Sequence, residues 1–196
     1  MAQNRSMESR VGRKNQRECF FWHEEPIGMG SRLLDDSWKI RNDRTFLLTS
    51  FPRAGYGSKG ERLVAGVVPL SADKTKVLMI QSAGPGGWVL PKGGWETDES
   101  TAQQAACREA WEEAGVICTV LRDLGLIPDM RPSGLLTAQA PKASYQFFEV
   151  SVDKEESQWP EMHKRKRQWV SYAQAATALA NRPELLEALN RSSLKR

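Results

Sequence analysis

Three glutamates near the middle of the chain, Glu109, Glu112 and Glu113, do most to restrict how it can fold. They are spaced i, i+3 and i+4, so on a helix they share one face. Carboxylates this close repel one another unless positive charge lies among them. Arg108 is one candidate, and a divalent cation such as Mg²⁺, which prefers oxygen ligands and leaves positions open for phosphate groups, is the better one. The segment therefore predicts a helix with a metal-binding face directed at a phosphate compound.

The neighbouring residues predict where this helix begins and ends. We expect it to run over residues 100–114. Ser100, followed three residues later by Gln103, is typical of a capping box, and the acidic Glu99 is favourable at a helix N-terminus. Gly115 suits the C-terminal cap, because glycine adopts the left-handed backbone conformation without strain. The helix is therefore well defined at both ends.

This segment resembles the Nudix box, G-x5-E-x7-R-E-U-x-E-E-x-G-U, where U is a bulky aliphatic residue. Ala110 is smaller than the pattern expects, and Ser100 stands where the pattern has its early glutamate, with Glu99 one place further from Arg108. Either Glu99 still serves through a one-residue insertion or that position is lost, and the cap at Ser100 favours the insertion. The matching positions are Gly94, Arg108, Glu109, Glu112, Glu113, Gly115 and Val116.

The rest of the chain predicts one α/β domain behind an N-terminal extension. With 196 residues and 40% hydrophobic content, the chain has the size of one ordinary domain. We expect residues 1–56 to be a partly disordered extension, with a linker at 55–60, and residues 57–196 to be the domain. Strands bracket the glutamate helix, and two helices end the chain, which favours a mixed sheet held between helices. This agrees with the α/β/α sandwich that the resemblance implies. The predicted strands are 63–70, 76–82 (a hairpin with the first), 117–125, 145–152 and 168–172, and the last helices are 173–180 and 184–194.

Motifs outside the box narrow the resemblance. Over about residues 62–196 the chain is similar to the diadenosine and diphosphoinositol polyphosphate phosphohydrolases, most of all to fungal members. The resemblance implies a hydrolase of diphosphoinositol polyphosphates, with diadenosine polyphosphates and inorganic polyphosphate as further substrates. The motifs are Arg62-Leu-Val-Ala-Gly, Lys76-Val-Leu-Met-Ile, Pro91-Lys-Gly-Gly, Asp129-Met-Arg-Pro132, His163-Lys-Arg165 and Arg182-Pro-Glu-Leu-Leu-Glu-Ala-Leu-Asn-Arg-Ser192.

Basic residues suit such a polyanionic substrate. The net charge is +4 although the glutamate helix is acidic, and basic surface attracts phosphate compounds. An inositol ring crowded with phosphates needs many charge-assisted contacts. The resemblance implies phosphate contacts at or near Arg62, Ser82, Lys92, Arg131 and Lys166. The full set of expected substrate-binding residues is Arg62, Ser82, Lys92, Gly93, Gly94, Arg131, Lys142, His163, Lys164 and Lys166.

The densest positive run, residues 163–167, lies directly before a predicted strand. In an extended segment, successive side chains point to opposite sides. We therefore expect one or two of these side chains to meet the substrate and the others to lie in solvent. A nuclear-targeting or nucleic-acid-binding patch is the other interpretation of such a run.

The resemblance also implies how the reaction proceeds. Glu109 and Glu113 would hold Mg²⁺, or Mn²⁺, with Glu112 beside them, and Glu112 would be the general base. Arg108 would orient the glutamates. The alternatives are an mRNA-decapping or nucleotide-sugar pyrophosphatase with the same chemistry, and a non-catalytic protein that binds inositol phosphate or RNA. Three clustered carboxylates argue against a protein that only binds anions.

The ends and hydropathy of the chain bear on location and partners. Residues 1–17 are polar and basic, without an apolar stretch long enough for a secretory signal. No segment approaches the roughly 18–20 apolar residues of a membrane helix. We therefore expect a cytoplasmic protein, with the nucleus as a second location, that binds small polyanions rather than membranes or nucleic acid. The oligomeric state stays open.

Overall fold

The computed structural model describes residues 54–138 and 141–196. Most of the extension predicted for residues 1–56 thus lies outside the described residues. Among the helices of the described part, none is long and apolar enough to cross a membrane. The elements are β1 (Arg62–Leu70), β2 (Val77–Gln81), β3 (Trp88–Val89), β4 (Lys92–Gly94), α1 (Ala102–Ala114), β5 (Val116–Pro128), the 3₁₀ helix η1 (Ser133–Leu135), β6 (Ala143–Glu155), β7 (Arg167–Val170), α2 (Tyr172–Ala178) and α3 (Pro183–Arg191).

The strands form one mixed sheet. Its order is β3-β2-β1-β6-β5, with β4 paired to β1 and β7 paired to β2. β1 runs parallel to β6 along its whole length, and the other pairs are antiparallel. β1 is buried from Val64 to Leu70, as expected of a central strand covered on both faces. The predicted pairing of the first two long strands is confirmed at Leu70 and Val77.

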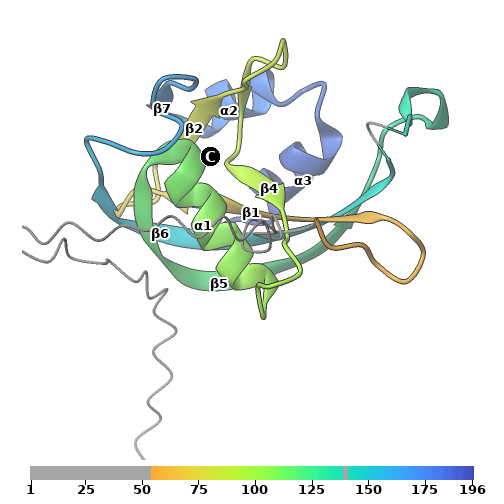
Figure 1. Cartoon of the computed structure of the whole chain (residues 1–196). Helices are drawn as coiled ribbons and strands as arrows, with labels where there is room; N and C mark the ends of the chain where they lie inside the picture. Colours follow the sequence, from red (N-terminus) through yellow and green to blue (C-terminus); the bar gives the residue numbers. More distant parts are fainter. Residues whose placement is uncertain (1–53, 139–140) are drawn as a thin grey trace, which may run out of the picture.

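Helices flank this sheet, which confirms the α/β architecture (Figure 1). α1 packs mainly against β1, β4 and β5, α2 packs against β2 and β3, and α3 packs against β5. Small side chains let α1 approach the strands closely, since its buried face carries Ala105, Ala106, Ala110 and Ala114. The same face carries two buried glutamates, so α1 brings carboxylates against the sheet as well as apolar groups.

The helix cap is displaced by one residue from its predicted place. Thr101, not Ser100, is the N-cap, and its hydroxyl accepts a hydrogen bond from the Gln104 backbone N–H. The Gln104 side chain in turn accepts from the Ser100 N–H. Thr101 and Gln104 are three residues apart, as are the predicted Ser100 and Gln103. Sequence spacing alone therefore could not decide between the two pairs. Gly115 caps the C-terminus with a φ of 63°, as predicted.

Residues 55–60 do not form the predicted linker. They make a tight hairpin into β1, in which the Gly57 N–H bonds to the Glu61 carbonyl and the Leu63 N–H bonds to the Gly55 carbonyl. Ala54 also forms a bridge with Glu96. The end of the predicted extension therefore pairs with the domain, because its glycines allow a turn as readily as a linker. The short strands β3 and β4 were not predicted either.

Candidate active site

Glu109 lies where α1 touches β4. Its side chain is only 12% exposed, and a Cβ atom on Gly93 would lie 2.0 Å from its carboxyl carbon. Glycine in β4 is therefore what lets this carboxylate reach the sheet. Burial raises the pKa of Glu109 to about 7; Arg108 opposes the shift, and the charges of Glu113 and Glu112 add to it.

Arg108 connects the acidic groups of this region. Its Nη1 atom donates to Glu109 Oε1 and to Glu112 Oε2, both at 3.0 Å, and its Nη2 atom donates to the Gly94 carbonyl at 2.9 Å. Its Nε atom donates to Glu99 Oε1 at 2.7 Å. Burial opposes the charge of Arg108, but its carboxylate partners raise its pKa overall. Arg108 thus orients the glutamates as expected, and Glu99 contacts the arginine despite its displacement by one position.

Glu113 is bound by residues other than Arg108. One of its oxygens accepts the Lys92 backbone N–H of β4 at 2.8 Å, and the other lies 2.6 Å from Arg165 Nη2. Arg165 comes from the segment between β6 and β7 and also pairs with Glu161, whose N–H bonds to the Glu112 carbonyl. Burial raises the pKa of Glu113, and Lys92 and Arg165 oppose that shift. The segment before β7 is therefore docked onto the carboxylate end of α1.

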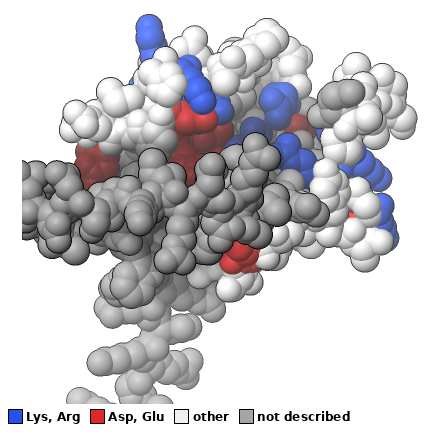
Figure 2. Space-filling model, in the orientation of Figure 1, with Lys and Arg blue, Asp and Glu red and all other residues white. Residues whose placement is uncertain are grey.

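Several cations gather beside these carboxylates. Burial lowers the pKa of Lys92; Glu113 opposes this, and the charges of Arg182 and Arg165 lower the pKa further. Ser82 belongs to the same region, since a Cβ atom on Gly86 would lie 3.2 Å from its hydroxyl and 4.0 Å from Arg182 Nη1. In Figure 2, blue lysine and arginine side chains lie next to the red carboxylates over α1. Positive charge from β4, the β6–β7 segment and the start of α3 thus converges near the glutamates.

Arg62 also reaches this region. Its Nη2 atom would lie 2.9 Å from a Cβ atom on Gly94, so glycine leaves room for the guanidinium over β4. Lys92, Gly93 and Gly94 thus lie beside the α1 carboxylates, with the Arg62 guanidinium next to Gly94 and Ser82 near Arg182, and their binding of substrate stays a prediction.

Two other residues predicted to bind substrate, Arg131 and Lys142, do not touch the α1 glutamates. Arg131 Nε donates to both oxygens of Asp129, at 2.9 and 3.1 Å, and Arg131 Nη2 donates to the Pro141 carbonyl. This ion pair holds the pKa of Asp129 at about 2. Lys142 is exposed, and its backbone carbonyl accepts the Arg62 N–H. Neither Arg131 nor Lys142 directly contacts a glutamate of α1.

The basic run begins in a turn over residues 161–164, and its less exposed residues are Arg165 and Arg167 rather than the three predicted to bind substrate. His163, Lys164 and Lys166 are exposed, and Lys164 lies 3.6 Å from Glu161. Arg165, with a side chain only 13% exposed, points to Glu113. Sequence reasoning missed Arg165 and Arg182 as members of the site. Alternation was the available signal for Arg165, but its phase cannot be read without knowing which side of the segment meets α1.

Two of the α1 carboxylates, but not a cluster of three, suit a divalent cation. In residues 54–138 and 141–196, no three His, Cys, Asp or Glu side chains converge in a geometry ready to hold a metal. Arg108 and Arg165 account for this, because they draw the glutamate oxygens to different sides. Mg²⁺ is commonly bound by only one or two carboxylates together with water and substrate phosphates. Glu109 and Glu113, buried and one helical turn apart, fit such a site.

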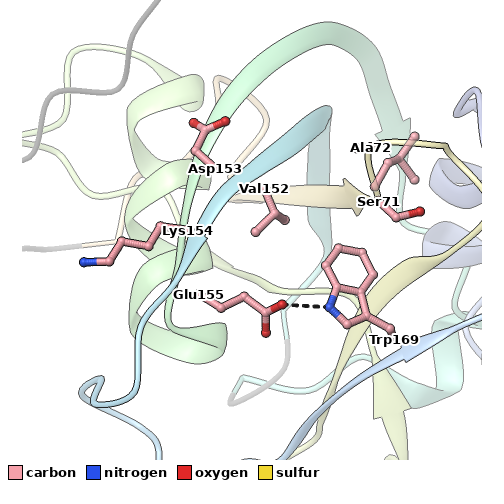
Figure 3. A pocket seen from close by; sticks show the side chains of 8 residues that line it. Ser71, Ala72, Val152, Asp153, Lys154, Glu155 and Trp169 are labelled. Atoms are coloured by element: carbon pink, nitrogen blue, oxygen red, sulfur yellow. Dashed lines mark hydrogen bonds between the residues drawn. The ribbon is translucent and has the colours of Figure 1, made fainter.

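A cavity of about 320 Å³ lies apart from these residues (Figure 3). It is lined by the end of β1, the end of β6 and Trp169 of β7. Trp169 donates its indole N–H to Glu155 Oε1 at 2.9 Å, and Glu155 also pairs with Arg167. Lys154 is the one cation among the eight lining residues and pairs with Glu156. This cavity lacks the positive charge that a polyphosphate requires.

Comparisons with known proteins agree with this geometry. The NUDIX domain matches residues 60–189. The chain is 38% identical over 136 residues to "Nudix hydrolase 16, mitochondrial" of Arabidopsis thaliana, covering 59% of this chain and 71% of the relative. A solved NUDIX hydrolase from Nitrosomonas europaea matches with a TM-score of 0.56 at 17% identity, covering 67% of this chain and 87% of that one. The C. elegans Ap4A hydrolase matches with a TM-score of 0.50 at 24% identity, covering 66% and 93%. These solved structures support the same fold.

Proposed function

The chain belongs to the Nudix family, and we propose that within this family it hydrolyses the diphosphate group of diphosphoinositol polyphosphates with the help of Mg²⁺. Pyrophosphohydrolase activity follows from the family. The substrate class is the finer proposal, and diadenosine polyphosphates and inorganic polyphosphate are further substrates within it.

The observation that carries the proposal is the concentration of cations next to the α1 carboxylates. Lys92, Arg165 and Arg182 are close enough for the charges of both arginines to lower the pKa of Lys92. Cations held this close repel one another, so the arrangement favours a ligand with several negative charges. An inositol ring with many phosphates, or a polyphosphate chain, has that charge density. Arg62 and Ser82 lie nearby to bind further phosphate oxygens.

The metal would be held by Glu109 and Glu113. Bound there, Mg²⁺ would offset negative charge on the diphosphate and on the departing phosphate. In this proposal Arg108 orients Glu109 and Glu112 through two 3.0 Å hydrogen bonds, both donated by its Nη1 atom. Lys92 fixes Glu113 through its backbone N–H, which leaves its side chain to contact substrate.

Glu112 is the proposed general base. It is the most exposed of the three glutamates, with 35% of its side chain accessible, so a water molecule can reach it. One of its oxygens accepts a hydrogen bond from Arg108, which orients the carboxylate. Glu112 would take a proton from the water that attacks phosphorus. The buried Glu109 and Glu113 are less accessible for this step.

A parallel assay tests the function. Turnover is measured for the one- and five-position diphosphoinositol isomers as released phosphate, and for diadenosine polyphosphate, capped RNA and a nucleotide sugar as released nucleotide products, each with Mg²⁺ and with a chelator. We expect Mg²⁺-dependent release that is fastest with a diphosphoinositol substrate. Faster turnover of capped RNA or of a nucleotide sugar would replace the proposed substrate class. Binding of inositol phosphate without any release would instead support a non-catalytic protein. The predicted cytoplasmic location is also a proposal, which fractionation of cells that express the tagged full chain would test.

A further inference from the structure

Glu184 is a fully buried carboxylate that the proposed chemistry does not use. It lies in the first turn of α3, and its exposed fraction is 0%. Its Oε1 atom accepts a hydrogen bond from Arg182 Nε at 3.1 Å. Its Oε2 atom is buried without a hydrogen-bond partner. Among the side-chain atoms of the described residues, this oxygen shares that condition with the Trp159 indole nitrogen.

A buried carboxylate with one unpaired oxygen, as in Glu184, contributes little to the stability of a fold. A buried carboxylate loses its hydration, and an oxygen without a partner is not compensated. Replacing a buried ion pair with neutral groups of similar shape is often neutral or stabilising. Stability alone therefore gives little reason for a glutamate here, and its effect on neighbouring charged groups is the better explanation.

The charged neighbour that Glu184 contacts is Arg182. This residue directly precedes α3 and has 31% of its side chain exposed. Its Nη1 atom is directed towards the loop of Ser82 and Gly86. Glu184 holds the inner Nε atom, which leaves the outer guanidinium nitrogens for that loop and for a ligand. The Pro183 ring restricts the backbone between the two residues, so the pair has little freedom to rearrange.

The charge of Glu184 also extends to β6. Burial raises the pKa of Tyr145, the charges of Glu184 and Asp129 raise it further, and Arg131 and Arg182 oppose them. Glu184 thus lies close to Tyr145, Arg131 and Arg182. An acid in this place balances cations that would otherwise repel one another.

We propose that Glu184 is a positioning residue for substrate binding, which holds the Arg182 guanidinium at the polyphosphate site by its buried Arg182–Glu184 hydrogen bond. Glu184 does not touch the substrate, and its effect passes through Arg182. This inference rests on the proposed function, because it assumes a polyanion beside Lys92.

A double-mutant cycle tests the coupling in the full chain. The variants are Glu184→Gln, Arg182→Ala and the double variant, with Glu187→Gln on the same helix as control, because Glu187 pairs with Arg191 on the surface. Titration calorimetry measures the affinity for inositol hexakisphosphate and for tripolyphosphate, and thermal unfolding measures Tm. Arg182→Ala should weaken binding about tenfold and Glu184→Gln about fivefold, because both lose a charge-assisted contact. Glu184→Gln should change the affinity less than about twofold when Arg182 is already alanine.

Tm separates positioning from a structural role. We expect Glu184→Gln to keep the Tm of the parent protein while it weakens binding, and Glu184→Asp to recover part of the affinity. A lowered Tm with unchanged affinity, or the same loss of affinity with and without Arg182, would overturn the inference. If the parent binds tripolyphosphate with the expected coupling but not inositol hexakisphosphate, the proposed substrate class fails and the role of Glu184 stands. If the parent binds neither, both fail.

Discussion

Two buried carboxylate regions of this molecule differ in how fully their charge is neutralised. Glu149 on β6 is almost inaccessible and accepts hydrogen bonds from Lys74, Arg122 and the Ser193 backbone N–H and hydroxyl. Burial alone would raise the pKa of Glu149, but these partners lower it. On α1, by contrast, the pKa values of Glu109 and Glu113 are raised in spite of their arginines.

The difference separates a structural acid from acids suited to bind a cation. Glu149 fixes the C-terminal segment to the sheet, and its charge is satisfied by the fold itself. Burial is the main cause of the raised pKa values of Glu109 and Glu113, and the neighbouring cations do not cancel it, so a cation bound directly to these carboxylates would stabilise their charged forms. Perturbed acids of this kind cluster at functional sites.

The largest expected effect is on turnover. Glu112→Gln should lower kcat by roughly 10²–10⁴-fold, because the variant cannot take the proton of the attacking water. Affinity for inositol hexakisphosphate should stay within about twofold, since the cations are unchanged. Phosphate release and titration calorimetry measure the two quantities. Glu156→Gln, which removes the half-buried carboxylate that pairs with Lys154, is the control. Near-normal turnover of Glu112→Gln would remove Glu112 from the role of base.

Opposite changes in stability should follow from neutralising an acid in each region. Glu149→Gln should lower the free energy of unfolding by about 2–3 kcal/mol, because charged hydrogen bonds to Ser193 and the two cations are lost. Glu109→Gln should raise it, because above pH 7 its buried charge disfavours the folded state. Urea unfolding at pH 8 with a chelator measures both. A Glu109→Gln variant that is as destabilised as Glu149→Gln would erase the distinction between the regions.

Asp129 should behave as a structural acid even though it lies among residues predicted to bind substrate. Its pKa is about 2 when folded, against an ordinary value of 3.8, so its contribution is present above pH 4 and is lost as pH falls towards 2. The shift corresponds to about 2 kcal/mol. Asp129→Asn should therefore be less stable than the parent at pH 6 and nearly equal to it at pH 2. Urea unfolding across this range provides the comparison, and a difference that does not depend on pH would refute the assignment.

The sequence was sufficient for the fold class and for the carboxylate face, because both depend on local patterns. The i, i+3, i+4 spacing places the glutamates without knowledge of the partner strands, and Gly115 ends the helix by its own backbone freedom. The closeness of Gly93 to the Glu109 carboxylate and of Gly94 to the Arg62 guanidinium depends on β4, a three-residue strand that no periodicity could reveal.

The basic residues were harder to place, because their roles depend on distant contacts. Arg131 lies in a sequence motif, but Asp129 two residues earlier engages it. Arg182 reaches the site from the C-terminal end of the domain, and the fold alone brings it near Lys92. In the run before β7, Lys164 and Lys166 are exposed and Arg165 is the inward residue, which only the docking of this segment on α1 decides.

The smallest expected effect is on substrate affinity, and it tests the docking of the basic run on α1. Arg165→Ala should weaken inositol hexakisphosphate binding about tenfold, a loss of about 1.4 kcal/mol, because a partly buried guanidinium beside Lys92 is removed. Lys164→Ala, one residue away and exposed, should change the affinity less than about twofold, since exposed charges interact weakly through water. Titration calorimetry at two salt concentrations measures both, and the loss for Arg165→Ala should persist at the higher one. Equal losses for the two variants would mean that the run acts only as a diffuse positive surface. Unequal losses would show that the run contacts the substrate through the residue that also holds Glu113.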